Sequence, residues 1–296
     1  MVRKAIISVF LLTVILSLGA FVPPASANGL HSALNIQALP IVPSMSGWVG
    51  AQTAYVVRRG IRLGNRADVF SKIGDSITSW RYFLAPIAEG KLNLGTYGTL
   101  SGAVGFFSKD PTRVGNSFYD VSLAAHGGWK AADLLDPAKA DPSVCKPNET
   151  PLDCELRVTR PSIALVMIGT NDLLDNNAYR FSMTLDHVLT AIEAHYVVPI
   201  VSTIPYRRDD PALQDRVEAY NQAIARVAIN HGAPLWNYWL AMVNLPANGI
   251  SNDGIHPSVP PDQNATAFDA AHLQFGFTMR NLTALEVLQS VMTVLK

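Results

Sequence analysis

The chain has few cysteines, no net charge and few long apolar segments. It has two cysteines in 296 residues, and its 23 basic side chains balance its 23 acidic ones. No run of basic residues occurs, which argues against nucleic acid or an anionic membrane as a partner. Neither cysteine has a histidine close to it in sequence, so the sequence predicts no metal centre built on them.

The one long apolar segment lies at the N-terminus. Arg3 and Lys4 precede an uncharged, mostly apolar stretch over residues 5–20, and the small residues 25–27 follow two prolines. This order predicts a secretory signal peptide over 1–27 and hence a secreted protein. An uncleaved membrane anchor is the alternative, but the apolar stretch is short of the roughly 20 residues that a spanning helix needs. No later segment is apolar enough to span a bilayer.

Export would place the two cysteines in an oxidising compartment. Cys145 and Cys154 bracket a short polar loop that contains two prolines. A disulfide between them would stabilise the fold by about 2–3 kcal/mol on a chain-entropy estimate. We predict this disulfide, and two free surface thiols are the alternative.

Composition divides the rest of the chain into two parts. Residues 28–67 are rich in proline, serine and glycine and are expected to form an N-terminal leader segment on the domain surface. Residues 68–296 are expected to form one α/β domain, in which the glycine-rich segment 91–116 is an inserted loop of the kind that often covers a site. Strand-like and helical segments alternate there, which predicts a mostly parallel sheet with helices on both faces. The five predicted strands cover 68–73, 118–123, 162–168, 197–203 and 233–237.

The helices between these strands carry boundary signals. An apolar stripe over residues 185–192 indicates one helix. Asp210 can cap the next helix, Pro211 can open it and Gly232 can end it. A last apolar stripe predicts a helix over 282–295.

Ser76 stands at a predicted strand-to-helix turn. The apolar run that ends at Ile73 leads into Gly74-Asp75-Ser76, and a helical pattern follows. A serine there presents its hydroxyl beyond the sheet edge, and its own N–H lies at a helix N-terminus, where an anion is favoured. Because a serine hydroxyl is a weak nucleophile, it needs a neighbouring base. Without such a base, Ser76 would only cap the helix.

The candidate base is His256, in the turn-rich segment 251–258. Asp253 precedes it by three residues, close enough to accept from the far imidazole nitrogen and to fix the tautomer. An exposed histidine after a turn is the alternative. Among the other histidines, His126 is the rival, because it precedes two glycines after the second predicted strand, but it lacks an acid at short spacing. We therefore predict a catalytic triad of Ser76, His256 and Asp253.

Donors for an oxyanion follow other predicted strands. Asn171 comes after the third strand, and its side-chain amide can donate into the cleft. Losing one such donor typically raises the barrier by roughly 3–4 kcal/mol. The N–H of Ser76 is a second donor, and either Gly127 or Gly128 can supply a third. Plain turns would explain the asparagine and both glycines equally well.

Taken together, three motifs resemble the GDSL/SGNH hydrolase family. Gly74-Asp75-Ser76 resembles its nucleophile block, residues 169–172 its asparagine block and residues 253–256 its acid-base block. The resemblance covers the chain from about residue 68 to the end. It implies a flavodoxin-like, three-layer α/β/α sandwich and ester hydrolysis without metal or cofactor.

The glycine block of that family is altered in this chain. Leu123 and Ala125 stand where the family has an asparagine and an earlier glycine. The residues after Gly128 fit the block, so the resemblance implies Gly128 as the oxyanion glycine.

The sequence therefore predicts a secreted serine ester hydrolase that forms an acyl-serine intermediate on a small-molecule, glycan or lipid ester. An acyltransferase with the same site and a non-catalytic cell-surface binding module are the alternatives. Trp80, Trp129, Phe106 and Phe107 are candidates to line an acyl or sugar pocket, although core packing explains aromatic residues equally well. No pattern indicates an oligomeric state.

Overall fold

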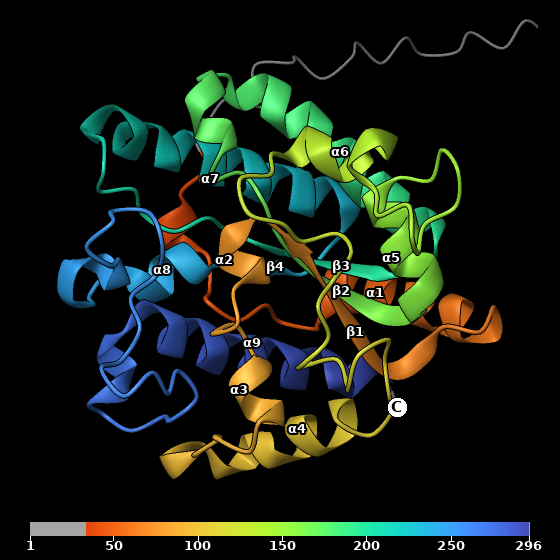
Figure 1. Cartoon of the computed structure of the whole chain (residues 1–296), viewed down its shortest axis with the longest axis horizontal. Helices are drawn as coiled ribbons and strands as arrows, with labels where there is room; N and C mark the ends of the chain where they lie inside the picture. Colours follow the sequence, from red (N-terminus) through yellow and green to blue (C-terminus); the bar gives the residue numbers. More distant parts are fainter. Residues whose placement is uncertain (1–33, 296) are drawn as a thin grey trace, which may run out of the picture. The chain divides into compact units, whose positions relative to one another are not determined.

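Four strands form one parallel sheet in the order β1-β2-β3-β4 (Figure 1). The computed structural model describes residues 34–295, so the predicted signal peptide over 1–27 lies outside the described residues. The strands are β1 (Arg66–Gly74), β2 (Pro161–Met167), β3 (Val198–Ser202) and β4 (Leu235–Trp236). The predicted α/β fold with a parallel sheet is confirmed, although the sheet has four strands and not five.

Helices cover both faces of this sheet. The α-helices are α1 (Gly47–Arg62), α2 (Ser76–Ser79), α3 (Ala85–Ala88), α4 (Ser101–Phe107), α5 (Pro151–Thr159), α6 (Ala178–Ala194), α7 (Pro211–His231), α8 (Tyr238–Met242) and α9 (Gly276–Leu295). The 3-10 helices are η2 (Ile36–Ala38), η3 (Gly95–Leu100), η4 (Ala131–Leu135), η5 (Pro137–Lys139), η6 (Asp172–Asp175), η7 (Pro246–Gly249) and η8 (His272–Gln274). Helices α5, α6 and α7 form one layer and α1, α4 and α9 the other, which makes a three-layer sandwich (Figure 1). No helix within residues 34–295 combines the length and apolarity needed to cross a membrane.

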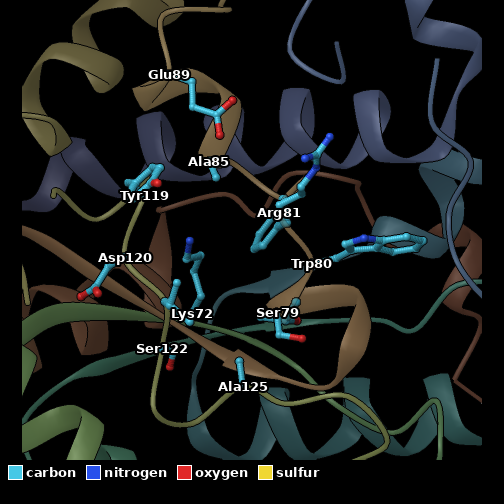
Figure 2. Close-up of a pocket in the computed structure, with 13 residues that line it drawn as sticks. Lys72, Ser79, Trp80, Arg81, Ala85, Glu89, Tyr119, Asp120, Ser122 and Ala125 are labelled. Atoms are coloured by element: carbon cyan, nitrogen blue, oxygen red, sulfur yellow. The ribbon is translucent and has the colours of Figure 1, made fainter. Parts of the chain in front are cut away.

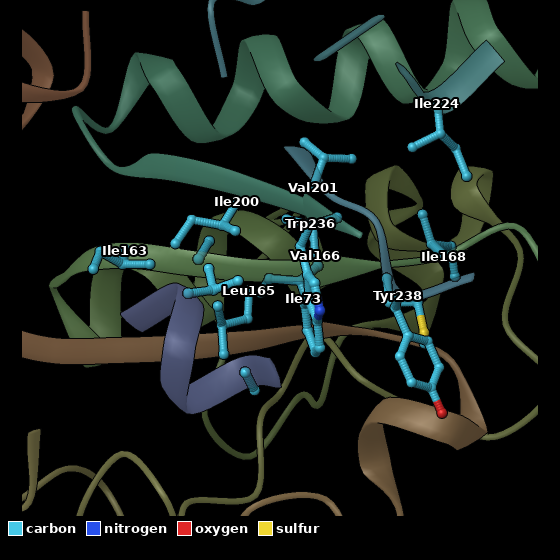
Figure 3. Close-up of a cluster of buried hydrophobic side chains, with 14 of the residues drawn as sticks. Ile73, Ile163, Leu165, Val166, Ile168, Ile200, Val201, Ile224, Trp236 and Tyr238 are labelled. Carbon is cyan, nitrogen blue, oxygen red and sulfur yellow. The ribbon is translucent and has the colours of Figure 1, made fainter. Parts of the chain in front are cut away.

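The core lies along the middle strands. All seven residues of β2 are buried, as expected for a strand covered on both faces. Ile73, Val166 and Val201 stand in register on three neighbouring strands and are buried together (Figure 3). Each such side chain contributes about 1.5–3 kcal/mol by leaving water, so this row of residues stabilises the carboxyl end of the sheet.

Helix α7 shows how local sequence sets the element boundaries. The carboxylate of Asp210 accepts a hydrogen bond from the Ala212 N–H at 2.8 Å, and Pro211 occupies the first helical position. Gly232 ends the helix at φ +62°, a left-handed conformation that glycine adopts without strain. These boundaries and the helices predicted over 185–192 and 282–295 are confirmed.

The predicted strand over 118–123 is wrong. The segment lies beside β1, but only one parallel bridge, between Gly74 and Ala125, joins the two. Side chains occupy the groups that a strand ladder would use. Lys72 Nζ donates to the Phe118 carbonyl at 2.9 Å, and the Leu123 N–H donates to the Glu155 carboxylate at 2.9 Å. These buried charged partners compete with strand pairing, and sequence periodicity does not reveal them.

Two further segments differ from the sequence expectations. Residues 47–62, within the expected leader segment, form α1, and its Val56 and Val57 are buried against the core. Segment 91–116 is not a structureless loop, because it contains η3 and α4. Phe107 of α4 packs on Phe70 of β1 with ring centroids 5.5 Å apart. Tertiary packing thus overrides the weak helix propensity of two glycine-rich segments.

A disulfide joins Cys145 to Cys154, as predicted. Cys154 lies on the buried side of α5, and Cys145 lies in the loop before that helix. Within the same loop, Glu149 pairs with Arg157 of α5 at 2.5 Å. A covalent and an ionic contact therefore fix this loop to α5.

Candidate active site

The sheet register brings two of the predicted motifs to one edge. Gly74 at the end of β1 pairs with Met167 at the end of β2, so the chain leaves both strands at the same place. A Cβ at Gly74 would lie 2.0 Å from the Met167 carbonyl oxygen, which explains the glycine there. Asp75 then caps α2 by accepting from the Ile77 N–H at 3.0 Å. Ser76 consequently occupies the first turn of a helix at the carboxyl edge of the sheet.

A hydroxyl, an imidazole and a carboxylate meet in one line at this edge. His256 Nε2 lies 2.9 Å from Ser76 Oγ, and His256 Nδ1 lies 2.7 Å from Asp253 Oδ2. The serine and the histidine are 180 positions apart in the chain. The ring of Trp80 meets the imidazole edge-on with centroids 4.9 Å apart and so limits its movement. The arrangement can pass a proton from the hydroxyl to the imidazole, with the carboxylate holding the far nitrogen.

Asp253 is built to remain a carboxylate. Its Oδ1 accepts from the N–H of Ile255 at 2.9 Å, from the N–H of His256 at 3.0 Å and from the Ser251 hydroxyl at 2.7 Å. Partial burial by itself raises the pKa of Asp253, but the backbone and side-chain hydrogen bonds outweigh it and hold the pKa well below its ordinary value. The group facing the imidazole is therefore a permanent anion at neutral pH.

The other candidate histidines face elsewhere. His126 is exposed, stacks on Trp129, and its Nδ1 lies 2.9 Å from the Gly127 carbonyl oxygen. A second Asp-x-x-His loop, which sequence reasoning overlooked, is formed by Asp269 and His272, with Nδ1 and Oδ1 2.9 Å apart. The free nitrogen of His272 meets Asp262 at 3.0 Å and not a hydroxyl. Of these two loops, the one with His256 therefore combines the spacing with a serine partner.

The proposed oxyanion donors come from loops that touch one another. Asn171 Nδ2 donates to the Trp129 carbonyl at 2.9 Å, which ties the loop after β2 to the glycine loop. Gly128 has φ +80°, a conformation that favours glycine. A Cβ at Gly127 would lie 3.9 Å from Ser76 Cβ, so the glycine loop borders the serine. In the described part of the chain, no acceptor takes the N–H of Ser76 or of Gly128.

Two buried acids support these loops and were given no role in the site from sequence. Asp172 accepts the Ala131 N–H with both carboxylate oxygens at 3.2 Å and thereby fixes the chain just beyond the glycine loop. Burial raises the pKa of Asp172 to about 7, and burial likewise raises the pKa of Asp75 to about 6. Both residues belong to the predicted motifs, but distant segments bury them, so their burial could not be inferred.

Arg280 of α9 lies fully buried beneath the turn that carries Ser76. It donates to the Ile77 carbonyl and, at 3.0 Å, to Thr78 Oγ1, and its guanidinium lies 3.6 Å from the Phe83 ring centroid. Burial lowers its pKa to about 10, so it remains a cation, and Asp75 is the acid whose charge acts on it. The one sequence signal was a single arginine within an apolar helix.

The aromatic residues considered as pocket lining divide into two groups. Trp80 is 38% exposed and lies beside His256. Trp129 and Phe107 are buried, and Phe106 packs edge-on against Phe107. Core packing therefore explains three of the four.

Comparison with known proteins places the chain in a family. The GDSL-like Lipase/Acylhydrolase family matches residues 73–260, which include all three motifs of the site. No curated protein sequence matches the chain.

Solved structures of several ester hydrolases are similar to the chain. A GDSL-like lipase from Bacteroides thetaiotaomicron is 13% identical with a TM-score of 0.45, over 82% of this chain and 98% of that chain. An acetylxylan esterase from Geobacillus stearothermophilus is 16% identical with a TM-score of 0.47, over 76% and 94%. A lipase/acylhydrolase from Enterococcus faecalis is 18% identical with a TM-score of 0.46, over 74% and 92%. On the family match, the chain belongs to the GDSL-like lipase/acylhydrolase family of carboxylic ester hydrolases.

Proposed function

We propose that the chain is a secreted serine ester hydrolase whose nucleophile is Ser76. The observation that carries this proposal is the unbroken line from Ser76 Oγ through His256 to Asp253, with contacts of 2.9 and 2.7 Å. Secretion is supported by the signal-like residues 1–27 and by the disulfide, because structural disulfides persist mainly in oxidising compartments.

Acylation begins when the Ser76 oxygen attacks the ester carbonyl carbon. His256 Nε2 takes the hydroxyl proton as the new C–O bond forms, and Asp253 stabilises the imidazolium. The carbonyl oxygen becomes an oxyanion, which meets the N–H of Ser76, the N–H of Gly128 and the side-chain amide of Asn171. Collapse of this intermediate breaks the bond to the alcohol oxygen, to which His256 returns the proton, and acyl-Ser76 remains.

Deacylation repeats these steps with water. His256 takes a proton from the water molecule as its oxygen attacks the acyl carbon. The second tetrahedral intermediate uses the same donors. Its collapse releases the carboxylic acid and returns the proton to Ser76.

The test is the variant Ser76→Ala, with Ser182→Ala on α6 as the matched control. We expect Ser76→Ala to lose hydrolysis of 4-nitrophenyl acetate and labelling by a fluorophosphonate, and to keep the wild-type melting temperature. Ser182→Ala should keep both reactions, because Ser182 is half-buried and, within residues 34–295, its hydroxyl is bonded only to its own helix, at the Tyr179 carbonyl. Full activity in Ser76→Ala would refute the nucleophile assignment. Product analysis with an added alcohol would reveal an acyltransferase if ester transfer exceeds acid release.

A further inference from the structure

A cavity of about 320 Å³ adjoins the site on its Trp80 side. Its walls come from β1, from segment 78–89, which begins in α2, and from segment 119–125 (Figure 2). Ser76 does not line the cavity, but Ser79 and Trp80 do. Trp80 also contacts the His256 ring, so the cavity and the histidine of the site share one side chain.

Lys72 places a charged group in this cavity from the middle of a buried strand. The residue is 6% exposed, and its Nζ donates to the Phe118 carbonyl at 2.9 Å, its one hydrogen bond within residues 34–295. An ammonium has three N–H donors, so two of them have no protein acceptor in that part of the chain. Figure 2 shows Lys72 pointing from β1 into the space between Tyr119 and Arg81. Burial lowers the pKa of Lys72 to about 8, so most of the population is charged at neutral pH.

Asp120 also belongs to the lining, but its carboxylate is turned away from Lys72 and the other labelled groups (Figure 2). Both of its oxygens are buried, so a ligand in the cavity does not reach them, and Arg113 Nη2 lies 3.9 Å from one of them. A buried polar group without a partner is costly. The unmatched groups open to a ligand are therefore the N–H donors of Lys72, which favour a ligand with hydrogen-bond acceptors.

The charges around Lys72 indicate the chemistry of that ligand. The negative charges of Asp120 and Glu155 act on Lys72 from within the protein, and Glu89 of the lining is paired with Lys91 at 2.6 Å. An alkyl chain would leave the Lys72 N–H groups without acceptors, and an anion would meet a lysine whose charge is already offset. A neutral molecule with several hydroxyl oxygens accepts from Lys72 without adding a charge.

Two exposed aromatic walls fit the same kind of ligand. Tyr119 is 43% exposed and Trp80 is 38% exposed where they line the cavity. Such rings offer flat apolar surface beside the polar groups, as the C–H face of a pyranose requires. Because His256 protonates the departing alcohol oxygen, the Trp80 wall beside it belongs to the alcohol side of the ester.

We propose that this cavity binds the alcohol part of the substrate and that this alcohol is a saccharide, with Lys72 hydrogen-bonding its free hydroxyls and Tyr119 and Trp80 contacting its ring. This inference rests on the proposed ester hydrolysis at Ser76. It makes the chain an esterase that removes acyl groups from sugar hydroxyls.

The experiment compares two acetate esters that share an acyl group and a six-membered ring. One is 6-O-acetyl-D-glucose and the other is cyclohexylmethyl acetate, which lacks the ring hydroxyls. We expect kcat/KM of the full chain to be at least tenfold higher for the sugar. Lys72→Met should lower this ratio at least tenfold, and Tyr119→Ala at least threefold. Lys139→Met, an exposed lysine on η5, should leave the ratio within twofold.

Equal hydrolysis of the two esters by the wild type, or a ratio unchanged by both cavity variants, would overturn the proposal. If Lys72→Met fails to fold, the more exposed Tyr119→Ala decides the outcome. Failure of the proposed function has a separate signature, which is no hydrolysis of 4-nitrophenyl acetate. In that event, calorimetric binding of 6-O-acetyl-D-glucose to the Ser76→Ala chain still tests the cavity. Binding that Tyr119→Ala weakens supports the saccharide site, and no binding refutes it.

Discussion

Replacement of Asp253 by asparagine isolates the charge of the acid from its shape. Oδ1 of Asp253 accepts from the N–H of Ile255 and of His256, so the amide oxygen of an asparagine would remain there. Its NH₂ group would then face His256 Nδ1, which must become the acceptor. The ring proton would move to Nε2, which would donate to Ser76 Oγ and could no longer take its proton.

The expected loss follows from this exchange of tautomers. In the best-studied serine hydrolase triad the same exchange lowers kcat about 10⁴-fold, so we expect about 10³–10⁴-fold here. That corresponds to roughly 4–5.5 kcal/mol of barrier. KM should change by less than about threefold, because the carboxylate contacts the imidazole and its own loop and no part of the cavity. The isosteric change should leave the melting temperature close to that of the wild type.

The chain supplies its own control for this measurement. Asp269 accepts from the N–H of Ala271 at 3.0 Å and of His272 at 3.1 Å, so it repeats the loop geometry of Asp253. Asp269→Asn should leave kcat for 4-nitrophenyl acetate within twofold, because that histidine faces Asp262. Steady-state kinetics of both variants beside thermal unfolding are sufficient. A kcat within tenfold of the wild type in Asp253→Asn would refute the assigned role of the carboxylate.

Three further predictions concern stability. In the range between its unfolded pKa of about 4 and its folded pKa of about 7, Asp172 holds a proton in the native state that the unfolded chain has released, so wild-type stability should fall as pH rises. Asp172→Asn has no carboxyl group to take up this proton. Its free energy of unfolding in urea, relative to that of the wild type, should therefore rise by about 2–4 kcal/mol from pH 4 to pH 8. Arg280→Met leaves the Ile77 carbonyl unpaired beneath the turn that carries Ser76 and should lower stability by about 3–5 kcal/mol and reduce kcat. Replacement of both Cys145 and Cys154 by serine should lower the free energy of unfolding by about 2–3 kcal/mol, because the disulfide closes a loop between cysteines nine positions apart. The value of kcat should stay within twofold, because neither cysteine belongs to the site.

Each of these has a contrary result. A relative stability of Asp172→Asn that is flat with pH would mean that the carboxyl is ionised in the folded state throughout. If Arg280→Met were as stable as the wild type and as active, the cation would have no role in supporting α2. Loss of activity in the double serine variant at temperatures where it remains folded would show that the loop communicates with the site.

The sequence predicted the location of the site because its motifs follow strands. Parallel strands end at one edge, so Ser76 after β1 and Asn171 after β2 had to lie near each other once the sheet was inferred. Helix boundaries such as Asp210 and Gly232 could also be predicted, because caps depend on residues adjacent in the chain. Features that depend on distant partners could not be predicted from the sequence. The segment over 118–123 has the composition of a strand, and only the buried Lys72 and Glu155 reveal why it forms none.

The same distinction explains why Asp-x-x-His spacing alone does not select His256. Asp253–His256 and Asp269–His272 have the same local hydrogen bonds, because an aspartate three positions before a histidine can bond both its backbone and its ring. Local sequence therefore fixes the tautomer in both loops and leaves one nitrogen free in each. What that nitrogen meets is decided by tertiary placement. The first loop meets the serine at the end of β1, whereas the second meets another carboxylate, which would hold an imidazolium and leave no base. A nucleophilic site thus requires the local motif and the sheet edge together, and exchanging the two loops' partners would exchange their chemistry.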